Sequence, residues 1–234
     1  DASYNLQVVS RGPASRMSEL SGIAGLELAR GDFDATIRVL GKDDSYDIVV
    51  NTGLSDLVGH YSEMVFEDHR LESKLDAKLT GGQIQLSNFS VQVRKSYTDA
   101  GSIRFNGGYD LDAETGNVQF QSVGINRHLF GTLLDSRIQS ERLGEAELKL
   151  EGQIVLERNR VTRLEGKVGI SQLSYALNDG EATTPFGVEV AGKAEISAER
   201  LKVREGSIQL TKMVRGDNLI RFEAEIPLGT NVTQ

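Results

Sequence analysis

Two histidines and three carboxylates between residues 60 and 69 form the densest group of side chains that could bind a metal ion. His60 and His69 lie close in sequence to Glu63, Glu67 and Asp68. Histidine pairs that bind zinc have a short, regular spacing that turns both rings toward one ion. A separation of nine residues does not place these two rings on one face of a helix. We therefore interpret both as histidines of the surface or of helix packing, and predict no metal site.

A second acidic group, formed by Asp110, Asp112 and Glu114, is similar to the start of a calcium-binding loop. The EF-hand loop places its ligands at alternate positions and requires a glycine at the sixth position. Here the glycine, Gly116, comes one place late. The pattern is more typical of solvated carboxylates in a turn.

The composition excludes most kinds of catalysis. The 234 residues contain no Cys and only 3 His, and there is no G-x-S-x-G motif. We therefore predict that the protein is not an enzyme and needs no cofactor. The formal charge of −8 disfavours nucleic acid and anionic membrane surfaces as partners. No apolar run approaches the roughly 20 residues of a membrane-spanning helix, so we expect no transmembrane segment in this chain.

Apolar and polar residues alternate along most of the chain, which is the period of a strand with one buried face. In Ile103–Leu111 every odd position is apolar or Gly, and the polar segment Asp112–Gly116 is typical of a hairpin loop. The same alternation recurs in segments that begin near Phe33, Tyr46, Leu71, Ile84, Val118, Ala146, Leu164, Phe186, Ile208 and Ile220. So many strands with short turns predict an all-β antiparallel sheet in one continuous domain, residues 1–234.

Two segments break this alternation and predict short helices. Apolar residues with helical spacing predict the first at about residues 54–66; they are Leu54, Leu57, Val58, Tyr61, Met64 and Val65. The second begins at Asn126 as its N-cap and carries Ile125, Leu129, Leu133 and Leu134. Each is too short to form alone, so we expect both to pack against an end or edge of the sheet.

Glycine is enriched, with 25 residues, and its positions fall into two sets. Most glycines mark turns. The others lie within strands on the apolar face, at Gly22, Gly107, Gly152, Gly166 and Gly192. A glycine within a strand costs about 0.5–1 kcal/mol relative to Ala, and it allows a sheet to bend toward its empty side. Their repeated placement predicts an elongated, strongly curved sheet with a concave apolar surface; the alternative for each glycine is close packing against a bulky neighbour.

Three stretches resemble the repeats of the AsmA-like superfamily, which includes the TamB-type envelope proteins. They are Leu75–Phe89, Ser102–Leu111 and Leu148–Leu156. The resemblance is clearest over residues 71–210 and weaker over residues 1–52. It implies an elongated sheet folded lengthwise into a hydrophobic groove, in a long periplasmic protein of the Gram-negative envelope that is anchored in the inner membrane. Because this chain lacks such an anchor and begins at Asp1, we expect it to be part of a longer protein.

The resemblance implies that the apolar face binds lipid and that it has no catalytic motif. The residues expected to line the groove are Ile84, Leu86, Ile103, Phe105, Tyr109, Val118, Phe120, Leu148, Leu150, Ile154, Leu156, Val168 and Ile170. Each methylene group that such a groove removes from water contributes about 0.8 kcal/mol. The family implies movement of phospholipid between inner and outer membranes, with phospholipid or another acyl-chain lipid as partner and envelope proteins at either end.

Two other functions fit the alternation of apolar and polar residues. A structural or scaffolding β-sandwich of the cell envelope, with two sheets that bury each other and no ligand, gives the same pattern. A carbohydrate-binding module needs exposed aromatic rings, and Trp is absent. The best candidates for such rings are Phe89, after an expected bulge at Asn88, and Tyr97.

Overall fold

The protein is an open sheet of antiparallel strands. The computed structural model describes residues 3–16, 24–62, 64–129, 144, 146–174, 176, 181, 183–197, 199–211 and 218–228. Its strands are β1 (Ser3–Pro13), β2 (Leu26–Lys42), β3 (Ser45–Tyr61), β4 (Met64–Thr80), β5 (Gln83–Lys95), β6 (Thr98–Asp110), β7 (Thr115–Val123), β8 (Ile125–Asn126), β9 (Glu147–Glu157), β10 (Arg160–Leu173), β11 (Phe186–Ile196), β12 (Arg200–Thr211) and β13 (Asn218–Pro227). The prediction of an all-β protein is confirmed.

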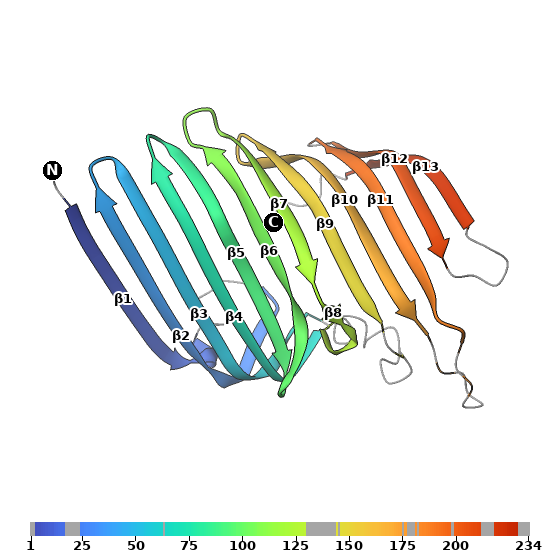
Figure 1. Cartoon of the computed structure of the whole chain (residues 1–234), viewed down its shortest axis with the longest axis horizontal. Coiled ribbons are helices and arrows are strands. Elements are labelled where there is room, and N and C mark those ends of the chain that lie inside the picture. Colours follow the sequence, from blue (N-terminus) through green and yellow to red (C-terminus); the bar gives the residue numbers. More distant parts are fainter. Residues whose placement is uncertain are drawn as a thin grey trace.

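The strands follow one another across a single 13-stranded sheet in the order in which they occur in the sequence (Figure 1). The short β8 lies off this path and pairs with β9, so twelve strands form the main run. At a spacing of about 4.8 Å, twelve adjacent strands extend over about 53 Å. The sheet is not closed, because β1 and β13 are each paired on one side only.

The predicted helix at residues 54–66 is wrong. Residues 45–61 form β3, and β4 begins at Met64. The register between these strands shifts between Leu54 and Leu57, and Asp56 has a positive φ of 51°. Such a bulge inserts one extra residue, so the next apolar side chain on the same face comes three positions later instead of two. The bulge therefore produced the spacing that is typical of a helix.

Only the beginning of the second predicted helix lies in the described part of the chain. Residues 127–129 are helical, and the backbone N–H of His128 donates to Asn126 Oδ1 over 3.0 Å, as an N-cap would accept. Leu133 and Leu134 lie outside the described residues. None of the helical segments that the structure describes has the length and apolarity needed to cross a bilayer.

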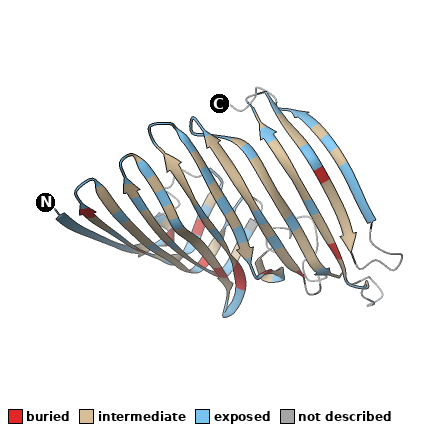
Figure 2. Ribbon diagram, turned by 45° about the horizontal axis from the view of Figure 1, so that its top comes forward, coloured by how far each residue is buried: buried red, intermediate tan, exposed pale blue. Residues whose placement is uncertain are grey.

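The sheet is curved into an open trough, and its two clusters of buried apolar residues lie along one edge of it. We call the two sides the inner face, which carries Phe105 and Phe120, and the outer face. Two small apolar clusters lie along the edge of the sheet that is opposite the β2–β3 and β4–β5 turns. Strand ends at this edge bend toward the inner face and pass behind the sheet in Figures 1 and 2. The buried members are Ala14, Leu28 and Leu57 in one cluster, and Ile125 and Ala146 in the other.

In the described part of the chain, no second layer covers most of the inner face. The chain exposes 15647 Å², whereas a compact monomer of 25.6 kDa exposes about 10,400 Å². Figure 2 accordingly shows long stretches of intermediate and exposed residues, with buried positions scattered among them. The excess of exposed area follows from the single layer, because each strand is shielded only by its neighbours.

Candidate functional site

The inner face carries a continuous row of apolar side chains and glycines that crosses the whole sheet. Cross-strand pairing connects its members from β1 to β10 and on to β11, and Gly206 of β12 lies next to Gly192 and opposite Phe222. This middle row consists of Val8, Ile37, Val50, Leu75, Phe89, Phe105, Phe120, Gly152, Gly166, Gly192, Gly206 and Phe222. Because paired residues in a sheet point to the same side, the row marks the inner face on every strand.

All the residues predicted to line a groove lie on this inner face. Register pairs Ile84 with Tyr109, Val118 with Ile154, and Leu148 with Ile170, and the other predicted residues alternate with these along the same strands. All are partly exposed, and Val168 is the most open, at 43%. They contact their neighbours in the sheet while one side of each remains accessible.

Among the described residues, the inner face carries no charged side chain between the strand ends; Lys95, at the end of β5 and opposite His69, lies at its rim. Every Asp, Glu, Lys and Arg of the described strands lies on the outer face, at a strand end or at a bulge. The few inner hydroxyl groups are largely bonded within the sheet: Thr52 and Ser73 lie 2.6 Å apart, and Ser122 Oγ accepts from the N–H of Leu150 over 2.7 Å. The surface is therefore apolar in chemistry as well as in residue type.

Three phenylalanines form a stack in the middle of the row. The rings of Phe89 and Phe105 have centroids 5.4 Å apart, and Phe105 and Phe120 are 6.5 Å apart. The register shift between Asp76 and Ala77 shows that β5 does contain a bulge next to Asn88. This bulge returns Phe89 to the inner face, so our expectation that Phe89 is an outward-facing aromatic is wrong. Tyr97 is fully exposed in the β5–β6 turn, as expected.

Beside the phenylalanines, four glycines on adjacent strands form a floor without side chains. Gly152, Gly166 and Gly192 were predicted to face inward, and the structure adds Gly206. The floor is about 14 Å wide, and rings overlie both ends of it. The Phe120 ring lies 2.8 Å from the position that a Cβ of residue 152 would occupy, and Phe222 lies 2.7 Å from that of residue 206.

The remaining predicted curvature glycines have different surroundings. Gly107 faces inward between Leu86 and Val118, and an added Cβ there would meet the backbone of Val118 at 2.8 Å. Gly22 lies outside the described residues. Gly206 was missed because the β12–β13 register shifts between Val203 and Gly206, which hides its face in the sequence pattern.

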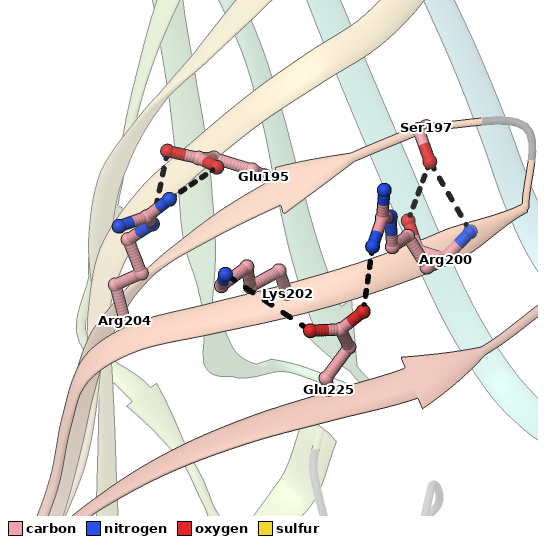
Figure 3. Close-up of polar contacts among 6 residues, drawn as sticks. All are labelled: Glu195, Ser197, Arg200, Lys202, Arg204 and Glu225. Atoms are coloured by element: carbon pink, nitrogen blue, oxygen red, sulfur yellow. Dashed lines mark hydrogen bonds and ion pairs between the residues drawn. The ribbon is translucent and has the colours of Figure 1, made fainter.

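The outer face carries the charges, largely as ion pairs between neighbouring strands. Arg200 and Lys202 of β12 contact Glu225 of β13 at 2.8 and 4.0 Å, and Arg204 contacts Glu195 of β11 at 3.2 Å (Figure 3). The hydrogen bond from Arg200 holds the pKa of Glu225 below its usual range. These pairs are exposed, so they contribute little to the stability of the sheet, and this face stays polar and hydrated.

The outer face is also hollowed behind the glycine floor. A cavity of about 570 Å³ lies there, lined by amide and charged side chains that include Asn106, Gln119, Gln153 and Lys193. Lys193 is neutralised by Glu205 at 2.9 Å, and Gln153 donates to Glu165 over 3.4 Å. The two sides of the same strands thus offer an apolar and a polar surface.

The residues that first suggested chemistry are spread apart or used in turns. His60 lies on the surface, 3.7 Å from Glu27, whereas His69 is buried on β4. Asp110 Oδ1 accepts from the backbone N–H groups of Asp112 and Ala113 at 2.9 and 2.8 Å, which is the geometry of a turn. Within the described ranges, no three His, Asp or Glu side chains come together as metal ligands would.

What this arrangement offers chemically is a long uncharged surface that removes apolar groups from water without recognising a particular polar group. Comparison with protein-family models, with curated proteins and with solved structures found no match to this chain.

Proposed function

We propose that this chain holds the acyl chains of phospholipid on its inner face, as a periplasmic segment of a longer, membrane-anchored protein that carries lipid between the inner and outer membranes. The observation that carries the proposal is the inner face, which has no charge between its strand ends and which, in the part of the chain that the structure describes, is covered only along one edge. The resemblance of residues 71–210 to AsmA-like repeats supports the same function.

The dimensions of the inner face fit several acyl chains. The hydrocarbon core of a bilayer is about 30 Å thick, so one acyl chain spans about 15 Å. A face about 53 Å long would accommodate about three such chains end to end across the strands. Each methylene group placed there leaves water, with a gain of about 0.8 kcal/mol.

The uniformity of the face suits movement better than storage. Along the middle row an acyl chain passes from aliphatic residues to the phenylalanines and then to the glycine floor, and it meets no charge. No step along this path requires a charge to lose its hydration, which would be the main barrier to sliding. The headgroups would remain in solvent at the open side of the trough.

The alternative is a structural or scaffolding domain of the envelope that binds no ligand. Its closed form, a β-sandwich, requires a second sheet over the inner face, and the strands that the structure describes form one sheet. One observation favours this alternative: both edge strands are open and carry exposed apolar residues, among them Leu6 of β1 and Ile220 of β13. Such edges could pair with strands of other envelope proteins.

A photocrosslinking amino acid tests the proposal directly. We expect a crosslinker at Phe105 or Phe120 to capture phospholipid in cells, detected by mass spectrometry. Arg104 and Gln119 precede these residues on the same strands and point to the outer face, so they are matched controls. Capture at neither inner position, or equal capture on both faces, would refute the proposal. A lipid-free chain in native mass spectrometry would favour the scaffold.

A further inference from the structure

The edge of the trough near the N-terminal strands is folded over the inner face as a small lip. We define the lip as residues 26–30, 57–61 and 64–68, the three strand ends that pair with one another beyond the bulges of β2 and β3. Asp56 and Asp68 have positive φ angles of 51° and 55°, and they mark the crease on β3 and β4. The lip contributes Leu26, Leu28 and Leu57 to a cluster that also contains Ala14, and Leu54 and Leu71 of the inner face.

His69 lies at this crease, and it is the buried polar side chain of the described core. Its exposed fraction is 1%, and its ring and that of Phe66 are in an edge-to-face arrangement with centroids 5.8 Å apart. Its register partners are Leu57 of β3 and Lys95 of β5. The backbone N–H of Glu67 donates to Nδ1 over 3.0 Å, so the neutral ring carries its proton on Nε2. Nε2 is buried without a hydrogen-bond partner.

The surroundings of His69 favour the neutral imidazole. Burial lowers its pKa from the ordinary value of 6.5, and the positive charge of Lys95 on β5 lowers it further. The hydrogen bond from Glu67 and the charges of Asp68 and Glu67 oppose this, but the net direction is downward. From β3 the register partner of His69 is the apolar Leu57. Asp56 of β3, Arg70 of β4 and Arg94 of β5 line the same hollow as His69, so charges of both signs lie near it.

We propose that the lip is a proton-operated latch, closed over the inner face while His69 is neutral and released when His69 takes up a proton from the solvent. The imidazolium ion needs a hydrogen-bond acceptor at each ring nitrogen, and in the closed lip Nδ1 faces a donor while Nε2 is enclosed without a partner. Swinging the lip outward hydrates the ring and uncovers Leu26, Leu28 and Leu57. This inference rests on the proposed function in one respect: release would widen the apolar face that receives acyl chains.

The size of the effect is bounded by the titration of one histidine. In the open lip His69 has an ordinary environment and binds its proton with a pKa of about 6.5. Lowering the pH from about 7.5 to about 5 then favours the open state by at most about thirtyfold, and the full factor is reached only if the closed state does not protonate at all. The closed state is thus stable above the ordinary pKa and is progressively lost below it.

Hydrogen–deuterium exchange on the lipid-free chain measures this opening. After correction for intrinsic exchange rates, we expect the protection of backbone amides at residues 57–61 and 64–68 to fall between about threefold and thirtyfold from pH 7.5 to pH 5. Amides of the sheet centre, such as those of residues 103–109, keep their protection. An unchanged lip, or an equal loss of protection in lip and centre, would overturn the proposal.

Two variants isolate the residue responsible. His69→Phe retains a ring beside Phe66 and cannot take up a proton, so we expect the lip to stay protected at pH 5. His60→Gln is the matched control, because His60 is an exposed histidine of the same lip and its contact at 3.7 Å, Glu27, also belongs to the lip. It should leave the loss of protection intact. A loss that persists in His69→Phe, or that disappears in His60→Gln, contradicts the latch.

The test remains decisive if His69→Phe does not fold. In that case NMR titration of the His69 ring in the unaltered protein is compared with the exchange data: protonation that accompanies lip opening supports the latch, and protonation of a ring whose lip stays protected refutes it. Because no lipid is present, the two proposals fail separately. A pH-dependent lip without crosslinking at Phe105 or Phe120 refutes lipid binding alone, and crosslinking with a lip that ignores pH refutes the latch alone.

Discussion

Adding one methyl group at Gly152 and at Gly192 should have opposite effects on stability, although both glycines belong to the same floor. Neither has a positive φ, so Ala suits the backbone of both positions. At Gly152 the new Cβ would meet the carbonyl oxygen of Glu165, the Cα of Gly166 at 2.9 Å and the Phe120 ring at 2.8 Å. At Gly192 its nearest neighbour is the Cα of Gly206 at 3.4 Å, an ordinary contact.

The magnitudes follow from these distances. Two of the three atoms that crowd Gly152 are backbone, so β10 has to move, and overpacking of this kind costs about 1–3 kcal/mol. Replacing Gly by Ala also stabilises the folded protein by about 0.4–1 kcal/mol, because it reduces the conformational entropy of the unfolded chain. We therefore expect Gly152→Ala to destabilise the protein by about 2 kcal/mol and Gly192→Ala to stabilise it by about 0.5 kcal/mol.

Urea unfolding followed by far-ultraviolet circular dichroism measures the free energy of unfolding of the two variants. The expected difference of about 2.5 kcal/mol between them also corresponds to about 5–10 °C in melting temperature, which a thermal scan measures for a chain of this size. Equal stability of the two variants, or a greater loss for Gly192→Ala, would show that close approach of strands does not determine where the floor requires glycine. Such a result would also show that the Phe120 ring does not need a glycine at position 152 beneath it.

Three further predictions concern the lip, a turn and the outer face. Leu57→Ala, at a position that is 3% exposed, should cost about 2–4 kcal/mol and should increase amide exchange in the lip before it does so in the sheet centre. The N–H groups of Ala113 and Asp112 lower the pKa of Asp110, so the stability of this turn should be full above the ordinary value of 3.8 and decline as the pH falls through the lower folded value; a carboxyl NMR titration that shows no depression contradicts this. Arg200→Ala removes an exposed ion pair with Glu225 and should change the melting temperature by less than about 3 °C, since a larger loss would mean that the pair acts as more than a surface contact.

Alternation of residue types predicted the strands and their faces because both follow from a local geometric rule. In Ile103–Tyr109 and Leu148–Leu156 every inward position could be assigned from the sequence, and the register of β6, β7 and β9 places these residues on one face. The inward position of Gly152, Gly166 and Gly192 follows from the same rule. Each strand of the main run pairs with its neighbours along the chain, so the order of the strands needs no further information. The local rule of alternation is therefore enough to predict most of this fold.

The errors and omissions are concentrated at bulges, where the local rule fails. An extra residue near Asp56 gave β3 an apparent helical spacing, and the bulge beside Asn88 reversed the expected face of Phe89. The shift before Gly206 concealed the fourth glycine of the floor. The lip and the burial of His69 were beyond prediction for a related reason, because they depend on how far several adjacent bulges bend their strands together.

The order of the strands has a consequence for how such a trough changes in length. Because each strand of the main run pairs with its neighbour along the chain, apart from the short β8, the loss or gain of one hairpin leaves the remaining pairs intact. Two strands are added or removed together, so the alternation of directions and the side on which apolar residues lie are both preserved. Each hairpin lengthens the trough by about 10 Å. Duplication of a segment of some 25 to 30 residues is therefore a complete unit of growth, and the distance that the sheet spans is set by the number of hairpins in the gene.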